Sequence, residues 1–443
     1  MGSLLVHGVG ARAESTGVTG GGQSHNNMQP SAPLNYLIRA GGDFANVGEV
    51  RMFAGGYAPG GYLLANGAEV AITSNETLFS LIGTTYGGDG RVTFALPDLR
   101  GRAAVHSGAG PGLSPRAVGD AWGSERVTLA DSHLPGHTHT LPWSGGGATG
   151  SAGGGSAHPN MQPSLGMHGR VALAGIFPSN GGEATTPFLG EVRLHASSFI
   201  DSAAYVPADG QTMVINQNMA LFALLGTTYG GNGTTNFALP DLRGRAAVGA
   251  SSSNPWGLGS YTGSETVTLS EDNMPGHVHA VPGDVTGSTG GDQPHANVQP
   301  SLTLNYIVAT EGIFPTSSTA LNDIFLGEIR LLAGNQIPPG WELAHGQMLS
   351  IASNPQLFTL LGVTYGGDGE VTFALPDLRG HTAIGMGEGT GLSERVLGER
   401  IGTEWETLTV DQLPGHSHTF VPEPGAFSLG LFMAMTGLAR RRR

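Results

Sequence analysis

The sequence contains no cysteine and no lysine, and only 12% of its residues are charged. Without cysteine, disulfides, zinc–thiolate sites and cysteine nucleophiles are excluded. All 20 basic residues are arginine, against 34 acidic residues, which leaves a net charge of −14. Such an acidic chain repels phosphate backbones, so we expect no nucleic-acid partner. Glycine, in contrast, is abundant, with 74 residues among 443, which favours many turns over long helices.

An internal repeat dominates the chain. The run LFSLIGTTYGGDGRVTFALPDLRGR from Leu78 has close counterparts from Leu221 and Leu357. Three further blocks also occur three times. The block GEVR or GEIR begins at Gly48, Gly190 and Gly327, and PGHxH begins at Pro135, Pro275 and Pro414. The block QPS begins at Gln29, Gln162 and Gln299. The interval between copies is far longer than a solenoid unit, so we expect each copy to be a domain.

These blocks divide the chain into seven segments. Three modules cover residues 46–141, 188–281 and 325–420. Residues 142–187 and 282–324 are predicted glycine-rich loops that each carry a QPS block, and residues 421–443 are a separate C-terminal segment. Gly20 to Tyr36 matches the middle of a module, so residues 1–45 are predicted to be the remnant of a partial module, and the gene is predicted to be longer, with a further module upstream.

The local patterns predict an α+β to mainly β fold with short helices and glycine-rich loops. Glu49 to Phe53 alternates polar and apolar residues, which indicates a strand with one buried face. Asn75 to Gly83 has the signals of a short helix, with Gly83 as its stop. A single helical turn is expected at Thr409 to Gln412, followed by an extended segment. The tracts 144–156 and 283–292 are expected to be mobile loops.

The sharpest chemical pattern is a His-x-His pair after each Pro-Gly. The pairs are His137 and His139, His277 and His279, and His416 and His418. Side chains at positions i and i+2 of a strand share a face, so each pair can present two imidazoles to one ion. Three pairs would give six nitrogen ligands for a divalent metal of the Zn or Fe type. The alternative is that these histidines are polar loop residues.

A third recurring histidine lies two residues before an asparagine. Its copies are His25, His158 and His295. For this histidine we favour a shared turn or hydrogen-bond role over metal ligation.

Other recurring residues have structural interpretations. Aspartate and arginine flank a leucine in each PDLRG block, where an ion pair or backbone hydrogen bonds would pin a strand end: Asp98 and Arg100, Asp241 and Arg243, Asp377 and Arg379. The Gly-Gly-Asp-Gly run is a tight turn, because no Gly-Lys-Ser/Thr accompanies it. One recurring glutamate per module, as at Glu125, does not make the carboxylate pair of a glycosidase. The chain is therefore not expected to be an enzyme.

Together, G-E-[VI]-R-x-[FL]-A-G, TTYGGDGxxTFALPDLRGR, PGHxH and H-x-N-x-QPS-x-x-LNY resemble the microcystin-dependent proteins, which are bacterial proteins with the phage tail-collar domain. The resemblance covers nearly the whole chain, three times over. It implies a tail-fibre-like, non-catalytic role, with a surface glycan or receptor as partner. In the similar phage short tail fibres, three chains contribute His-x-His pairs to a metal on the trimer axis. Here the resemblance implies a pseudo-threefold body with one central octahedral metal, or self-association into trimers.

The C-terminus resembles another known pattern. Val421, Pro422, Glu423 and Pro424 precede an apolar run, Ala426 to Ala439, and four arginines. This order is similar to the PEP-CTERM sorting signal, which implies an exosortase-type partner, export to the cell envelope or beyond, and a C-terminal membrane anchor. The N-terminus, however, has no clear signal peptide.

Three functions therefore remain open at the level of sequence. The favoured one is an exported, tail-fibre-like structural or adhesion protein of the bacterial cell surface. The second is a component of a phage tail or a phage-derived injection particle. The third, a surface glycan hydrolase, is the least favoured.

Overall fold

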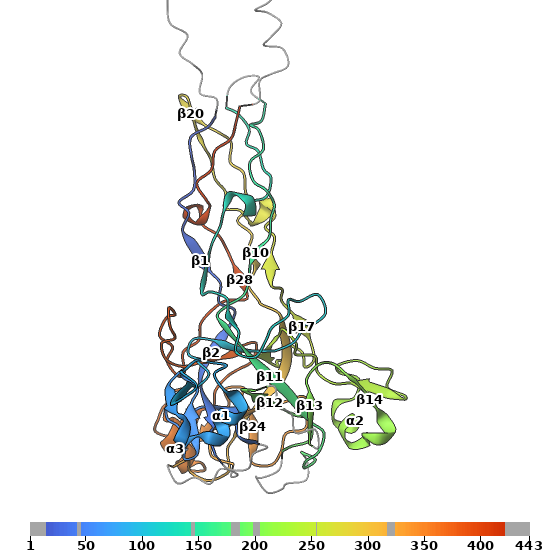
Figure 1. Cartoon of the computed structure of the whole chain (residues 1–443). Coiled ribbons are helices and arrows are strands. Elements are labelled where there is room, and N and C mark those ends of the chain that lie inside the picture. Colours follow the sequence, from blue (N-terminus) through green and yellow to red (C-terminus); the bar gives the residue numbers. More distant parts are fainter. Residues whose placement is uncertain are drawn as a thin grey trace, which may run out of the picture.

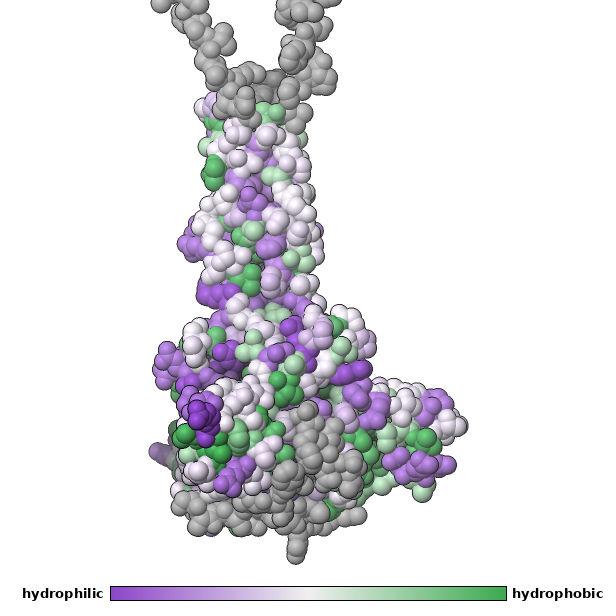
Figure 2. All heavy atoms as spheres, viewed as in Figure 1, coloured by the Kyte–Doolittle hydropathy of each residue, from purple (hydrophilic) through white to green (hydrophobic). Residues whose placement is uncertain are grey.

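The computed structural model describes residues 15–41, 46–142, 147–178, 187–197, 204–253, 255–316 and 324–420. Within these ranges the fold is mainly β with short helices, as predicted. Figure 1 shows a slender stem above a broader body. The stem contains β1, β10 and β28, and the body contains β2, β11, β12 and the α-helices. Figure 2 shows that the visible face of the stem is mostly polar or neutral, with small scattered apolar patches.

The three repeats give nearly the same elements in the same order, except that an isolated bridge from Ile401 to Ser31 replaces, in the third repeat, the short strand β8 of the first and β17 of the second. After a stem strand, β1 (Ser24–Asn26), and the long strand β2 (Ser31–Arg39), the first repeat contains β3 (Glu49–Phe53), β4 (Tyr62–Leu64), β5 (Glu69–Ala71), α1 (Glu76–Ile82), β6 (Thr93–Ala95), β7 (Ala103–His106), β8 (Ala121–Trp122) and β9 (Arg126–Thr128). The second contains β10 (His158–Pro159), β11 (Ser164–Ala172), β12 (Glu191–His195), β13 (Tyr205–Pro207), β14 (Thr212–Val214), α2 (Met219–Leu225), β15 (Asn236–Ala238), β16 (Ala246–Gly249), β17 (Tyr261–Thr262) and β18 (Thr266–Val267).

The third repeat completes the series. Its elements are β21 (His295–Ala296), β22 (Ser301–Ala309), β23 (Glu328–Leu332), β24 (Trp341–Leu343), β25 (Met348–Ser350), α3 (Pro355–Leu361), β26 (Thr372–Ala374), β27 (Thr382–Gly385) and β28 (Trp405–Glu406). A small hairpin, β19 (Ala280–Val281) and β20 (Asp284–Val285), lies near the upper end of the stem in Figure 1. One-turn 3₁₀ helices occur at Ile72–Ser74, Asp131–His133, Ile215–Gln217, Glu271–Asn273 and Val410–Gln412.

The helix predicted at Asn75 to Gly83 is α1. It begins after Asn75 and ends at Gly83, whose φ of 52° and ψ of −134° suit glycine. Leu78 and Ile82 are buried in the main core. The one-turn helix predicted near Thr409 is also present, and the Gln412 side chain accepts a hydrogen bond from the Thr409 N–H at 2.8 Å.

The GEVR strands form the centre of the body. Each of β3, β12 and β23 pairs antiparallel with both of the others, always through the start of one strand and the end of the next. The prediction of a strand at Glu49 to Phe53 is correct, but the prediction of one buried face is wrong. All five residues are buried: Glu49 and Arg51 bond to charged residues of β12 and β23, whereas Val50 and Met52 pack in the main core.

The QPS blocks form the longest strands and connect neighbouring repeats. β2, β11 and β22 each pair antiparallel with the GEVR strand that follows them. Each also pairs in parallel with a strand of another repeat: β2 with β27, β11 with β7, and β22 with β16. Residues 31–39, predicted to belong to a partial module, therefore lie beside the third repeat.

The glycine-rich tracts are not free loops. Within the described residues, His137 bridges Ala152 and His277 bridges Thr289, so these tracts run along the stem beside the His-x-His segments. Thr19, near the N-terminus, bridges His416 in the corresponding way. The expectation of mobile loops missed these hydrogen bonds, because composition does not show which backbone groups find partners.

Candidate metal centre

The structure brings the six histidines of the His-x-His pairs together inside the stem. Their rings lie edge to face, with centroid separations between 4.7 and 5.5 Å for the pairs in contact. All six side chains are buried, and His416, at 5%, is the most exposed. One polypeptide thus supplies the whole cluster.

The backbone fixes the orientation of each imidazole. Within each pair, the first histidine places Nδ1 3.0 Å from the carbonyl oxygen of the proline two residues earlier: Pro135, Pro275 and Pro414. The second histidine places Nδ1 2.8–2.9 Å from a glycine carbonyl of a neighbouring segment: Gly287, Gly17 and Gly150. A carbonyl only accepts, so each Nδ1 must carry the proton, which leaves the Nε2 lone pair free to bind a metal.

The Nε2 atoms converge on one another. The Nε2 of His416 lies 3.2 Å from that of His137 and 3.3 Å from that of His277. In an octahedron with metal–nitrogen bonds near 2.1 Å, adjacent nitrogens are about 3 Å apart. The other three Nε2 atoms, of His139, His279 and His418, are buried and have no hydrogen-bond partner. Six lone pairs in such proximity fit a cation.

The protonation state also fits metal binding. Burial and the neighbouring imidazoles together lower the pKa of His137, His139 and His277 to about 4. These three rings are therefore neutral at pH 7, as metal ligands must be. Asp and Glu are absent from the described clusters of potential metal-binding side chains, so the donor set is purely imidazole. This set suits Zn, Fe, Ni or Cu rather than Ca or Mg.

Glycine is needed beside these histidines. Gly20, Gly153 and Gly290 have φ between 99° and 116°. A Cβ at Gly153 would overlap the carbonyl oxygen of Pro135, which holds Nδ1 of His137. The glycine-rich composition of the stem therefore has a physical cause in the close approach of its chains.

A second buried cluster, missed at the level of sequence, is a closed ring of charges on the GEVR strands. Each arginine donates from Nε to the glutamate two residues before it, at 2.8–3.1 Å, and from Nη1 to the glutamate of another strand, at 3.0–3.3 Å. The members are Glu49, Arg51, Glu191, Arg193, Glu328 and Arg330. Burial opposes ionisation of Glu49, but Arg193 and Arg51 outweigh it and lower its pKa. The recurrence of Glu and Arg two residues apart was the available signal.

The aromatic residues at one aligned position pack beside this ring. The guanidinium carbon of Arg51 lies 5.6 Å from the ring centroid of Tyr62, and that of Arg330 lies 4.9 Å from Trp341. Tyr62, Tyr205 and Trp341 are each only 4% exposed, so they are core residues and not an exposed sugar-binding surface.

The aspartate and arginine of each PDLRG block form a bidentate ion pair. Arg100 donates from Nε and Nη2 to the two carboxylate oxygens of Asp98, at 2.8 and 2.9 Å. Asp241 with Arg243 and Asp377 with Arg379 have the same geometry. These pairs lie in the body, away from the histidine cluster, and fix the ends of the strands.

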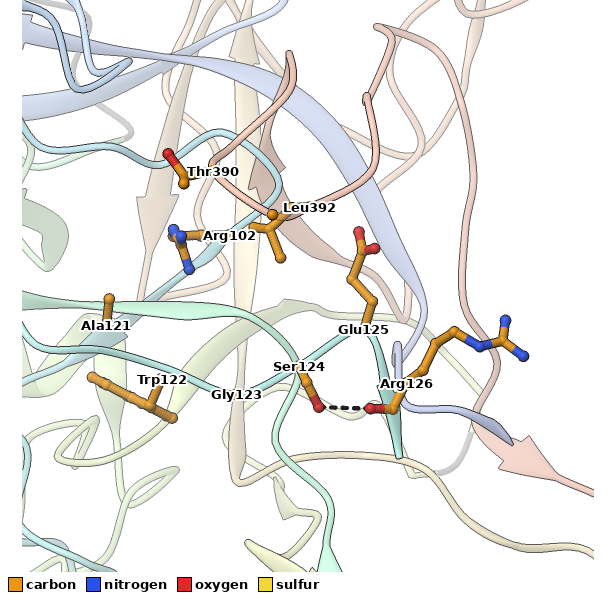
Figure 3. A pocket seen from close by; sticks show the side chains of 10 residues that line it. Arg102, Ala121, Trp122, Gly123, Ser124, Glu125, Arg126, Thr390 and Leu392 are labelled. Atoms are coloured by element: carbon orange, nitrogen blue, oxygen red, sulfur yellow. Dashed lines mark hydrogen bonds between the residues drawn. The ribbon is translucent and has the colours of Figure 1, made fainter. Parts of the chain in front are cut away.

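The recurring glutamates bind loops of a neighbouring repeat. Glu125 accepts hydrogen bonds from Ser393 and Arg395, and Glu265 accepts from Ser114 and Arg116. Glu125 also lines a cavity of about 560 Å³ between the first and third repeats (Figure 3). It is the sole acidic residue among the described lining residues, so this cavity lacks the carboxylate pair of a glycosidase.

Three stretches of the chain, residues 48–104, 190–247 and 327–383, match the family model of the phage tail collar domain. The chain carries three phage tail collar domains. No curated protein and no solved structure matches the chain. Each collar domain begins at a GEVR or GEIR strand and ends within the strand after PDLRG, so the His-x-His segments lie outside the matched residues.

The collar domain is a structural domain of phage tail fibres, and its three copies indicate a tail-fibre-like structural protein. Within the described ranges, no helix has the length and apolar character needed to cross a membrane. Val421, Pro422, Glu423 and Pro424, the predicted sorting signal, lie outside the described residues.

Proposed function

We propose that this protein is a single-chain counterpart of a trimeric tail fibre, with three collar domains in a pseudo-threefold body and one divalent metal held by six histidines in the stem. The observation that carries the proposal is the convergence of Nε2 atoms from His137, His277 and His416, one from each repeat, at 3.2–3.3 Å. Without a cation, these lone pairs would face one another at a cost in free energy.

Cyclic contacts between equivalent residues support the pseudo-threefold body. The charge ring of the GEVR strands passes from repeat to repeat and returns to its start. The side-chain amides of Asn27, Asn160 and Asn297 also donate in a closed cycle, in the opposite direction, to the carbonyl oxygens of Met161, Val298 and Met28, each at 2.9 Å. Collar domains assemble as trimers in fibres, and one chain here has all three copies.

The metal has a structural role in this proposal. The metal would cross-link three His-x-His segments that are far apart in sequence and so stabilise the stem above the body. Because the six imidazoles would fill an octahedral shell, no position would remain for a substrate, which agrees with a non-enzymatic protein.

Elemental analysis combined with the mass of the particle in solution tests this function. We expect one metal ion per chain at the six-histidine cluster and a monomer near the chain mass of 45.3 kDa. Replacing His137, His277 and His416 with alanine should abolish that ion and lower the melting temperature. His381→Ala is the matched control, because His381 lies in a PDLRGH block and not in the stem. Unchanged metal content in the triple variant would exclude the cluster as the site.

For its location, we propose export to the bacterial cell envelope, with a role in adhesion to a surface glycan or receptor. This proposal is supported by the C-terminal sequence pattern alone. Incorporation into a phage or phage-derived particle is the second candidate, favoured by the collar domains themselves. Fractionation of the native host separates the two, since recovery with the envelope supports anchoring and co-sedimentation with particles supports the second candidate.

A further inference from the structure

A second group of three histidines lies lower in the stem, separate from the six. His25, His158 and His295 begin or lie within the short strands β1, β10 and β21, one from each copy of the H-x-N block. Each pair of rings has a centroid separation of 5.2 Å and a nearly perpendicular arrangement. The side chains are 0–3% exposed, so solvent does not reach them.

The hydrogen bonds of these histidines fix one tautomer. The Nδ1 atoms of His25, His158 and His295 lie 2.9–3.1 Å from the carbonyl oxygen of the next residue in the chain. Each Nδ1 therefore carries the proton, and each Nε2 presents a lone pair. All three Nε2 atoms are buried without a hydrogen-bond partner, and one atom from each histidine lies within 4.8 Å of the others. Three converging acceptors without a donor are costly to bury.

The next layer of the stem contains three more buried acceptors. Asn27, Asn160 and Asn297 follow these histidines by two residues, so their side chains lie on the same side of the chain. Their amide groups are fixed by the cyclic bonds described above, and their Oδ1 atoms are buried without a partner. The distance between layers is about 6.7 Å along an extended chain. A water bound to the metal would lie between the histidine and asparagine layers and bridge much of this distance.

We propose that His25, His158 and His295 form a second metal site, in which three neutral imidazoles bind a divalent transition-metal ion and the three asparagine oxygens accept hydrogen bonds from its water. The inward lone pairs select a cation over an anion, because an anion needs N–H donors. Imidazole donors without carboxylates select Zn, Co, Ni or Cu over Ca or Mg.

The site is independent of the six-histidine cluster. Two apolar layers separate them along the chain, one of Leu129, Leu269 and Leu408 and one of Leu134, Met274 and Leu413, all at most 3% exposed. A metal ion can therefore bind to either site, or be removed from it, without the other. A negative result at one site leaves the proposal for the other site intact.

Anomalous diffraction from crystals of the unmodified protein loaded with Zn²⁺ or Co²⁺ tests the proposal directly. We expect a peak about 2.0–2.1 Å from the Nε2 atoms of all three histidines, whether or not a second peak appears at the six-histidine cluster. If protein loaded with each of Zn²⁺, Co²⁺, Ni²⁺ and Cu²⁺ gives no peak between these three atoms, the proposal is wrong.

Metal stoichiometry in solution gives a second test. His295→Gln should lose one bound ion relative to the unmodified protein, because two imidazoles hold a metal far more weakly than three. His133→Ala is the matched control, since His133 is the next histidine in the stem, with its ring centroid 6.2 Å from that of His158, and should keep every ion. Equal metal content in His295→Gln and the unmodified protein would contradict the site.

Discussion

At the scale of single residues, the stem and the body bury polar groups that the chain must satisfy completely. In the body, the three carboxylates of the charge ring balance its three guanidinium groups, and only Oε2 of Glu328 and Nη2 of Arg330 among the atoms of the ring are buried without a hydrogen-bond partner. In the stem, the Nε2 atoms of six histidines have no hydrogen-bond partner: His25, His158, His295, His139, His279 and His418. Buried charges that are paired are tolerated, whereas loss of one partner leaves an uncompensated charge.

Glu49→Gln is therefore expected to destabilise the body strongly. Glu49 bonds to both Arg51 and Arg193, so neutralising it removes a negative charge that these two guanidinium groups share. We expect the free energy of unfolding to fall by about 3–5 kcal/mol, measured by urea denaturation. Glu76→Gln, at an exposed position of α1, is the control and should change it by less than about 0.5 kcal/mol. Equal effects of the two substitutions would show that the ring does not contribute.

At one buried position the second repeat lacks a tyrosine that the other two have, and the structure compensates for this difference. Tyr36 and Tyr306 each donate to an alanine carbonyl at 3.0 Å, but Gly169 stands at the matching position. The side chain of His106, where the other repeats have glycine, fills that space, and a Cβ on Gly169 would overlap the His106 ring. Burial lowers the pKa of His106 to about 3, so the ring is neutral at pH 7.

This compensation predicts strong coupling between Gly169 and His106. Gly169→Tyr alone should cost at least about 1–3 kcal/mol through overpacking, whereas Gly169→Tyr combined with His106→Gly should recover most of that loss. A double-mutant cycle by thermal or urea unfolding measures the coupling, which we expect at about 0.5–3 kcal/mol. Additive effects of the two substitutions would refute this account.

At the scale of elements, the sequence predicted the local features and missed those that depend on other repeats. The strand at Glu49 to Phe53, the helix before Gly83 and the Gly-Gly-Asp-Gly turn follow from spacing and turn chemistry within a few residues. Burial of both faces of β3, and pairing of the glycine-rich tracts with the His-x-His segments, depend on chain far away in sequence. Local patterns contain no information on such partners.

The turn after each helix gives a testable pH dependence. Oδ1 of Asp89 accepts three backbone N–H bonds, from residues 91–93, and Asp368 does the same. These bonds lower the pKa of both from 3.8 to about 2. A carboxylate whose pKa is lowered in the folded state stabilises the fold fully above about pH 4. This stabilisation is lost as the pH falls through about 2, where the carboxylate becomes protonated.

Replacing Asp89 and Asp368 with asparagine should therefore make the loss of stability between about pH 4 and pH 2 shallower. Asn232 already accepts the same three bonds in the second repeat and does not titrate. Asn232→Asp is the reverse control and should make the acid loss steeper. Melting temperatures of the three proteins across this range measure the slopes, and identical slopes would rule out the turn as a contributor.

At the scale of the whole molecule, the sequence established three copies of one domain, and the family comparison agrees with three collar domains. The sequence did not show that residues 15–39 pair with the far end of the chain. β1 pairs with β9 of the first repeat, but β2 pairs with β27, and Thr19 with His416, of the third. Self-similarity reveals the copies, whereas the order of their contacts depends on three-dimensional packing.

Removal of residues 1–41 is accordingly expected to destabilise the third repeat as well as the first, because β27 and the His416 segment lose their neighbours along with β3, β4 and β9. Hydrogen exchange should show loss of protection in residues 382–385 and 411–418 of the third repeat as well as in residues 49–53 of the first, with the second repeat least affected. A synthetic peptide of residues 15–41, added in excess, should restore that protection. Loss spread evenly over the three repeats, or no rescue by the peptide, would contradict the specific pairing.

The pairing of β2 with β27 also delays the folding of β2 during translation. β2 ends at Arg39 and its partner begins at Thr382, so the first long strand leaves the ribosome well before its neighbour exists. At about 5–20 residues per second, the wait is roughly 20–70 s. During that interval a nascent strand with an apolar, unpaired edge is exposed to other nascent chains. A chaperone that shields the first forty or so residues, or a pause late in translation, would therefore strongly affect the yield of folded protein.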